Sequence, residues 1–151
     1  MQARNVLPIN RSSTQVAVPP QPQANTPRAF RRPLEEILED LRRPIPERFI
    51  KTKSKKGVAL KFVSWYDIVR ILEARAPGFE YDCSPHFGDG KTVVKATITI
   101  HGEDGSLSRS ALGIADSDIE NWGDATSNAS SMALRRAAAE FGLGLHLYWE
   151  K

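Results

Sequence analysis

Residues 88–105 contain the pattern that most restricts the fold, which is two glycine-rich turns on either side of an alternating segment. The turns read Gly88-Asp89-Gly90-Lys91 and Gly102-Glu103-Asp104-Gly105. Similar alternating segments precede the first turn, at 79–83, and follow the second, at 107–114. Alternation of apolar and polar side chains is typical of a half-buried strand. Two tight turns that join three such strands predict an antiparallel β-meander. The central strand should bury its apolar set, Val94, Ala96, Ile98 and Ile100.

Two short helices are predicted before the meander. In 34–43 the apolar residues follow the helical i, i+3, i+4, i+7 spacing, with acids early, arginines late and Pro33 in front. The next helix begins after Ser64, a capping residue, and ends at Pro77-Gly78. We expect its buried stripe to consist of Trp65, Ile68, Val69 and Leu72.

A third helix, from about 124 to 141, has an apolar face rich in small residues. Gly142 and Gly144 follow it and suit the left-handed backbone that closes helices. Alternation at 143–148 then predicts a last extended piece. The predicted fold class is therefore α+β, with an antiparallel β-meander packed on a C-terminal helix (a β-β-β-α core) and short N-terminal helices.

The chain divides into a tail, residues 1–32, and one folded domain, residues 33–151. The tail is rich in proline and glutamine and has no helical or strand period, so it is predicted to be disordered. The arginines Arg4, Arg11 and Arg28, with no acid among residues 1–30, also resemble an organellar transit peptide. A solvated tail and a targeting peptide are therefore both open interpretations. The longest apolar runs are too short to cross a bilayer, so no membrane-spanning segment is expected.

Charge is unevenly distributed along the chain. The net formal charge is only +3, but residues 1–61 have 13 Lys or Arg against 5 Asp or Glu, and the remainder has 8 against 13. Such asymmetry is typical of chains that bind nucleic acid or an anionic surface. The densest basic segment, read here as a loop or hairpin tip, contains Lys51, Lys53, Lys55 and Lys56.

No catalytic or metal-binding pattern is present, so we expect no enzyme activity, cofactor or metal. The single cysteine, Cys83, and three scattered histidines lack metal-ligand spacing. The acidic cluster at 116–124 departs from the EF-hand pattern, since Asn121 and Ser127 replace its glycine and glutamate. Phosphate-binding loops, nucleophile elbows and dinucleotide fingerprints are also missing.

Two adjacent arginines on the third helix are a second basic feature. Arg136 has Glu140 one turn later, which allows an ordinary ion pair within the helix. Arg135 has only Ser131, Met132, Ala138 and Ala139 at its helical neighbour positions. A guanidinium on a face of small side chains permits close approach of a phosphodiester backbone.

The string Met132-Ala133-Leu134-Arg135-Arg136-Ala137-Ala138-Ala139-Glu140-Phe141-Gly142 resembles the signature of the Rad-fifty-two superfamily of DNA single-strand annealing proteins. Pro46-Glu47-Arg48-Phe49-Ile50 resembles its entry segment, and Leu60-Lys61-Phe62-Val63-Ser64 its first strand and helix start. The ending Leu145-His146-Leu147-Tyr148 is similar to the branch that holds the bacterial DNA damage response protein A and the plant organellar relatives. The resemblance covers residues 33–151, in the family order.

The resemblance implies a ring-forming homo-oligomer that binds single-stranded DNA by its backbone in a basic groove and anneals complementary strands in recombinational double-strand break repair. It implies DNA contacts at Arg135, Arg136 and Lys53, while Lys51, Lys55 and Lys56 are candidates by charge alone. The first turns of the third helix lack the basic residues that some relatives use for an outer DNA site. Two alternatives remain, a sequence-independent RNA-binding module and a non-catalytic adaptor.

The resemblance also carries expectations about location and partners. We expect a bacterial cytoplasmic protein associated with the nucleoid, or an organellar one if the tail is a transit peptide. Other repair proteins are candidate partners of the tail, and no membrane partner is expected.

Overall fold

The structure is a computed structural model that describes residues 32–116 and 124–149. The predicted tail therefore lies outside the described residues except for Arg32. Most of the predicted acidic connection lies outside them as well, since only Asp116 and Asp124 are described at its two ends.

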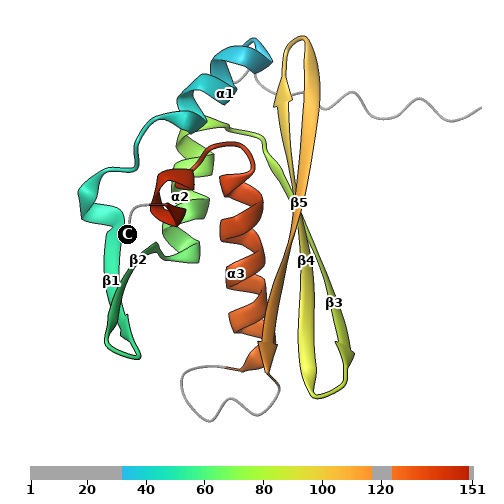
Figure 1. Cartoon of the computed structure of the whole chain (residues 1–151). Coiled ribbons are helices and arrows are strands. Elements are labelled where there is room, and N and C mark those ends of the chain that lie inside the picture. The colour runs from blue at the N-terminus through green and yellow to red at the C-terminus, as the bar shows by residue number, and fades with distance from the viewer. Residues whose placement is uncertain (1–31, 117–123, 150–151) are drawn as a thin grey trace, which may run out of the picture.

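The predicted meander is confirmed. Strands β3 (Glu80–Gly88), β4 (Lys91–Gly102) and β5 (Gly105–Asp116) form an antiparallel sheet in the order β3-β4-β5 (Figure 1). At the first turn, Asp89 and Gly90 have φ angles of 52° and 67°, the left-handed backbone that a two-residue hairpin turn requires. The predicted apolar set of the central strand is fully buried: Val94, Ala96, Ile98 and Ile100.

Helix α3 (Ala125–Ala139) packs on one face of this sheet, as the α+β prediction requires. Asp124 caps it by accepting a hydrogen bond from the Ser127 amide at 2.7 Å. Small side chains let the helix approach the sheet closely, and Gly113 of β5 lies against the helix backbone. A Cβ atom at Gly113 would overlap the backbone of Ala129 and Ala133. The small-residue face predicted from sequence therefore sets the distance between helix and sheet.

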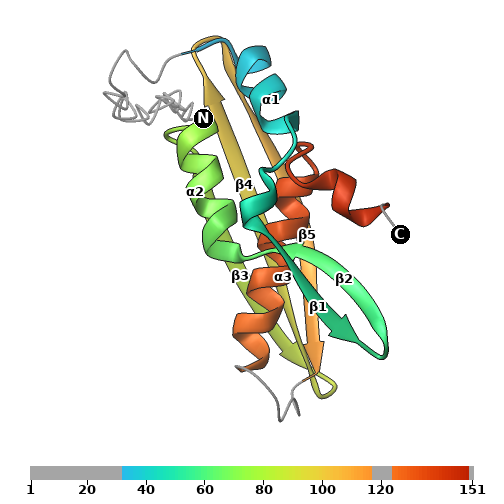
Figure 2. The same ribbon diagram turned by 90° about the vertical axis from the view of Figure 1, so that its left-hand side faces the viewer.

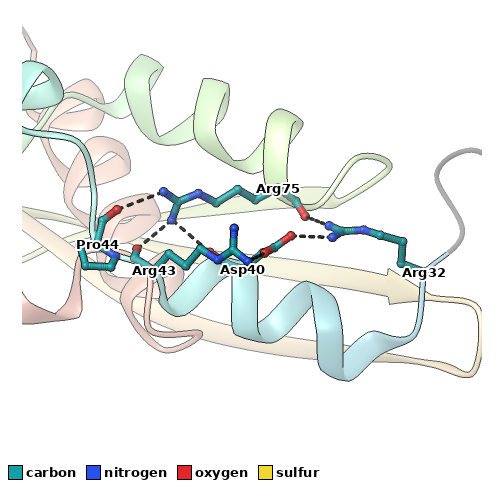
Figure 3. A network of polar contacts seen from close by, with 5 residues as sticks. All are labelled: Arg32, Asp40, Arg43, Pro44 and Arg75. Carbon is teal, nitrogen blue, oxygen red and sulfur yellow. Dashed lines mark hydrogen bonds and ion pairs between the residues drawn. The ribbon is translucent and has the colours of Figure 1, made fainter.

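Helices α1 (Leu34–Arg42) and α2 (Trp65–Arg75) complete the core, with Ile37, Leu41 and Leu72 fully buried. Arg75 joins the two helices, because its guanidinium donates to three backbone carbonyls at and just beyond the end of α1 (Figure 3). Arg32 adds a second link by donating to the Asp40 carboxylate and to the Arg75 carbonyl, at 2.5 and 2.6 Å. These arginines donate to carbonyl groups in the last turn of each helix and in the segment that follows α1.

A second antiparallel pair consists of β1 (Ile50–Lys55) and β2 (Val58–Val63), which follow the short 3₁₀ helix η2 (Glu47–Phe49). This hairpin projects from the body, and α3 lies between it and the sheet (Figures 1 and 2). The segment 51–57, predicted as a loop or hairpin tip, is therefore part of a hairpin, in which residues 51–55 are strand. The turn itself is Lys56-Gly57, with φ angles of 51° and 78°. Pairing with β2 provides hydrogen-bond partners for the backbone N–H and C=O groups of β1, although most of its residues are exposed.

Three finer predictions are wrong. Trp65 is 52% exposed and Ile71 is buried instead, because α2 turns a different side to the core. Ser64 precedes α2, but its side chain makes no capping bond and accepts one from Lys51 instead. Residues 145–148 form a 3₁₀ helix, η3 (Leu145–Tyr148), because the left-handed backbone at Gly144 coils the chain after α3.

Candidate nucleic-acid interface

One face of the β1–β2 hairpin has a column of lysines beside a column of apolar side chains. Residues two apart on a strand share a face, so Lys51, Lys53 and Lys55 point the same way. Directly opposite residues of paired strands also share a face. The register pairs these lysines with Phe62, Leu60 and Val58, respectively. We call this surface the lysine face.

The lysine face turns toward α3 at its base. The guanidinium carbon of Arg135 lies 6.0 Å from the centroid of the Phe62 ring, a distance that permits a cation–π contact. Burial lowers the pKa of Arg135, while the nearby Tyr148 acts in the opposite direction. Arginine nevertheless remains charged at neutral pH. The contact therefore places a partly desolvated positive charge beside the lysine column.

Arg135 has no acidic partner among the residues that the structure describes. A charge that is removed from water without a counter-ion is costly. A bound anion would lower that cost, and a phosphate fits a guanidinium with two parallel hydrogen bonds. This half-buried guanidinium is therefore chemically suited to accept an anion.

Arg136 does not join this site. Its Nη1 atom donates to the Leu112 carbonyl of β5 at 2.9 Å, on the side of α3 away from the hairpin. It does not form the predicted ion pair with Glu140; both residues line a surface cavity of about 520 Å³ between β5, α3 and η3. The structure thus separates the predicted arginine pair.

The four predicted lysines also differ from one another. The Lys51 ammonium donates to the Ser64 hydroxyl at 2.8 Å and to the Tyr66 hydroxyl at 2.5 Å, and lies 3.9 Å from the Asp67 carboxylate. These contacts hold it at the base of the hairpin, and its hydrogen bond lowers the pKa of Tyr66. Lys53 and Lys55 are exposed along the strand, and Lys56 occupies the turn.

The sequence interpretation missed Phe62 as a contact of Arg135 and Trp65 as an exposed ring. The signal for the hairpin was present, since three alternating lysines and three alternating apolar residues flank Lys56-Gly57. A dipeptide that tolerates left-handed backbone between two alternating segments is typical of a two-residue hairpin. Treating the lysines only as a charge run concealed their common face.

The described residues contain neither a metal-binding cluster nor a membrane-spanning helix. Within residues 32–116 and 124–149, no group of three or more His, Cys, Asp or Glu side chains could hold a metal ion. Over the same residues, no helix has both the length and the apolar character to cross a membrane. Asp118 and Glu120 of the acidic cluster lie outside the described residues.

Comparison with known proteins finds two plant relatives, both from Arabidopsis thaliana. The chain is 39% identical over 122 residues to "DNA repair RAD52-like protein 1, mitochondrial", which covers 79% of this chain and 69% of that protein. It is 36% identical over 124 residues to "DNA repair RAD52-like protein 2, chloroplastic", covering 79% and 62%. No protein-family profile matches the chain.

The names of these relatives correct one expectation. Both place the relative in a plant organelle. The expected bacterial cytoplasmic location is therefore wrong, and the organellar alternative agrees with the relatives. The identity to the first relative extends across more than two thirds of both chains, so the chain belongs to the RAD52-like family, the Rad-fifty-two superfamily whose motifs its sequence resembles.

Proposed function

We propose that this protein binds single-stranded DNA through its phosphate backbone and anneals complementary strands during recombinational repair of double-strand breaks. The observation that carries the proposal is the pairing of Arg135, which has no acidic partner among the described residues, with the lysine face of the hairpin. The names of the relatives support the repair setting, since both are called DNA repair proteins.

The proposed mechanism has no bond-breaking step and so requires neither a catalytic residue nor a cofactor. Phosphates lie along the lysine face, where Lys53 and Lys55 neutralise them and Arg135 binds one at the base. Contacts to phosphate fix the position of a strand without reading its sequence. Bases not held by the protein remain available for a complementary strand, which is the requirement for annealing.

A homo-oligomer completes the proposal. One hairpin presents only a short lysine column, so a longer strand needs several copies side by side. The sheet has free edges at β3 and β5 within the described residues, and backbone groups on such edges can pair with another chain. We propose a ring or arc in which neighbouring lysine faces form one continuous basic path.

The proposed setting is an organelle, by analogy with the mitochondrial and chloroplastic relatives. In that case residues 1–32 act as a targeting segment, as their arginines and lack of acids suggest. Contacts of this tail with other repair proteins are a second role that we retain as a proposal.

Annealing of complementary oligonucleotides, together with a mass measurement of the free protein, tests the proposal. We expect an oligomer that accelerates annealing, and we expect Arg135→Ala to weaken binding of every single-stranded sequence by roughly ten-fold, the cost of one charged hydrogen-bonding partner. Lys95→Ala, which removes an exposed positive charge from the central strand β4, is the matched control and should bind as wild type does.

Three results would contradict the proposal. A monomer without annealing activity contradicts both the oligomer and the function. Unchanged binding by Arg135→Ala contradicts the assigned site. Tighter binding of a matched RNA strand than of DNA would favour the RNA-binding alternative.

A further inference from the structure

Two exposed aromatic rings lie at the junction of β2 and α2. Trp65 is 52% exposed and Tyr66 is 42% exposed. Their ring centroids are 5.8 Å apart with an interplanar angle of 82°, so the rings meet edge to face. Backbone binding by the lysine face and Arg135 assigns no role to either ring.

The pair is held in a fixed orientation. The Tyr66 hydroxyl accepts a hydrogen bond from the Lys51 ammonium, which also lies 4.7 Å from the Tyr66 ring centroid. Lys51 is fixed in turn by the hydroxyl of Ser64, which is buried. Tyr66 therefore supports Trp65 from its side, while about half of the Trp65 side chain stays in contact with solvent.

The pair also continues the lysine face. Lys51 is the lysine of that face farthest from the hairpin turn. It is paired in register with Phe62, the ring that Arg135 contacts. A strand whose phosphates follow Lys55 and Lys53 toward Arg135 thus reaches the aromatic pair at the base of the hairpin. Bases and phosphates alternate along such a strand, so an exposed ring beside a phosphate path is within reach of a base.

We propose that Trp65 stacks one unpaired nucleobase of the bound strand at the base of the hairpin, with Tyr66 and Lys51 as positioning residues. This inference rests on the proposed function and adds a base contact to its phosphate contacts. Stacking on an aromatic ring accepts every base, because each base has a π-face. Binding therefore remains independent of sequence, and one base in each protomer is withheld from pairing.

Binding of a (dT) oligonucleotide compared with an abasic oligonucleotide of equal length isolates the base contact. We expect wild type to prefer the (dT) strand, and we expect Trp65→Ala to weaken (dT) binding by roughly 5- to 150-fold per stacked base while leaving abasic binding unchanged. Trp65→Phe keeps a ring and should retain most of the preference. Trp149→Ala, which removes a tryptophan that is 64% exposed on the C-terminal segment, is the matched control.

The outcomes separate this inference from the proposed function. If wild type binds both strands but Trp65→Ala weakens them equally or not at all, the base contact is wrong and the phosphate site stands. If wild type binds neither strand, the proposed function and this inference both fail. If Trp65→Ala changes only the oligomer mass, Trp65 lies between copies of the chain and the base contact is again wrong.

Tryptophan fluorescence is a second test of the base contact, and it does not require that the alanine variant folds. With Trp122 and Trp149 replaced by phenylalanine, Trp65 is the sole tryptophan of the chain. Adding the (dT) strand should quench its emission, and adding the abasic strand should leave it unchanged. Equal quenching by both strands would overturn the inference.

Discussion

Arg135 and Arg136 are neighbours in the chain, yet α3 directs their guanidinium groups to different surfaces. Successive helical residues lie about 100° apart around the axis. Because α3 lies between the hairpin and the sheet, this rotation places Arg135 against Phe62 and Arg136 against the Leu112 carbonyl. Arg136 therefore has a protein acceptor, and Arg135 is the member of the pair that is open to a phosphate.

The packing of α3 on β5 depends on the absence of a side chain at Gly113, since a Cβ atom there would overlap the backbone of α3. Gly113→Ala should destabilise the fold by about 1–3 kcal/mol, because the added methyl group would force α3 away from β5. Urea unfolding followed by circular dichroism measures the loss. Gly105→Ala, on the same strand with open space around its Cβ position, should have a much smaller effect. Equal stabilities of the two variants would contradict this packing.

At the scale of elements, a polar network joins α1 to α2, and its one carboxylate makes the junction sensitive to acid. The hydrogen bond from Arg32 lowers the pKa of Asp40 below its ordinary value of 3.8. The folded state thus favours the charged carboxylate. The stability gained is complete above the ordinary pKa and is lost as the pH falls through the lowered one.

Asp40→Asn should therefore lower stability at about pH 6 and make the decline below about pH 4 shallower than in wild type. Unfolding midpoints in urea across this range measure both effects. Glu39→Gln removes an exposed carboxylate from the same helix. Its stability should fall with decreasing pH as steeply as that of wild type. If the stability of Asp40→Asn also falls with pH as steeply as that of wild type, the ion pair between Arg32 and Asp40 does not contribute to stability as described.

The elements with strong periodicity were predictable from sequence, and those set by tertiary contacts were not. Alternation and turn glycines determine the meander, and helical spacing determines α1 and α3, because these patterns follow from local geometry. Trp65 was misplaced because the face that α2 buries depends on how it packs, and its first residue lies at the edge of that face. The 3₁₀ helix η3 was missed because Gly144 changes the chain direction within an alternating segment.

The candidate site was predictable in composition but not in arrangement. Charge alone identified Lys55 as a candidate, and the family resemblance implied DNA contacts at Lys53 and Arg135. Their meeting depends on the packing of the hairpin beside α3, which brings together residues about 80 positions apart in the chain. Tertiary contacts also direct Arg136 away from Arg135, toward the Leu112 carbonyl, and hold Lys51 against the Ser64 and Tyr66 hydroxyls.

At the scale of the whole molecule, three lysines of the basic N-terminal half and one arginine of the acidic C-terminal half lie on the same side of the β1–β2 hairpin. Residues 1–61 have an excess of eight positive charges, and the remainder has an excess of five negative ones. Folding places Arg135 against the Phe62 ring of the lysine face, and the lysines of that face belong to the first part. The net charge of +3 therefore understates the local charge that a DNA backbone would meet.

Salt dependence of (dT) binding tests this account most directly, because each neutralised phosphate contributes about 0.7 to the slope of log K against log salt on single strands. Removing two lysines of the lysine face, in the variant Lys53→Gln with Lys55→Gln, should reduce that slope by about 1.4. The variant Lys91→Gln with Lys95→Gln removes two exposed charges from β4 and should leave the slope unchanged. A wild-type slope in the first variant, or equal reductions in both, would contradict the claim that the lysine face binds the phosphate backbone.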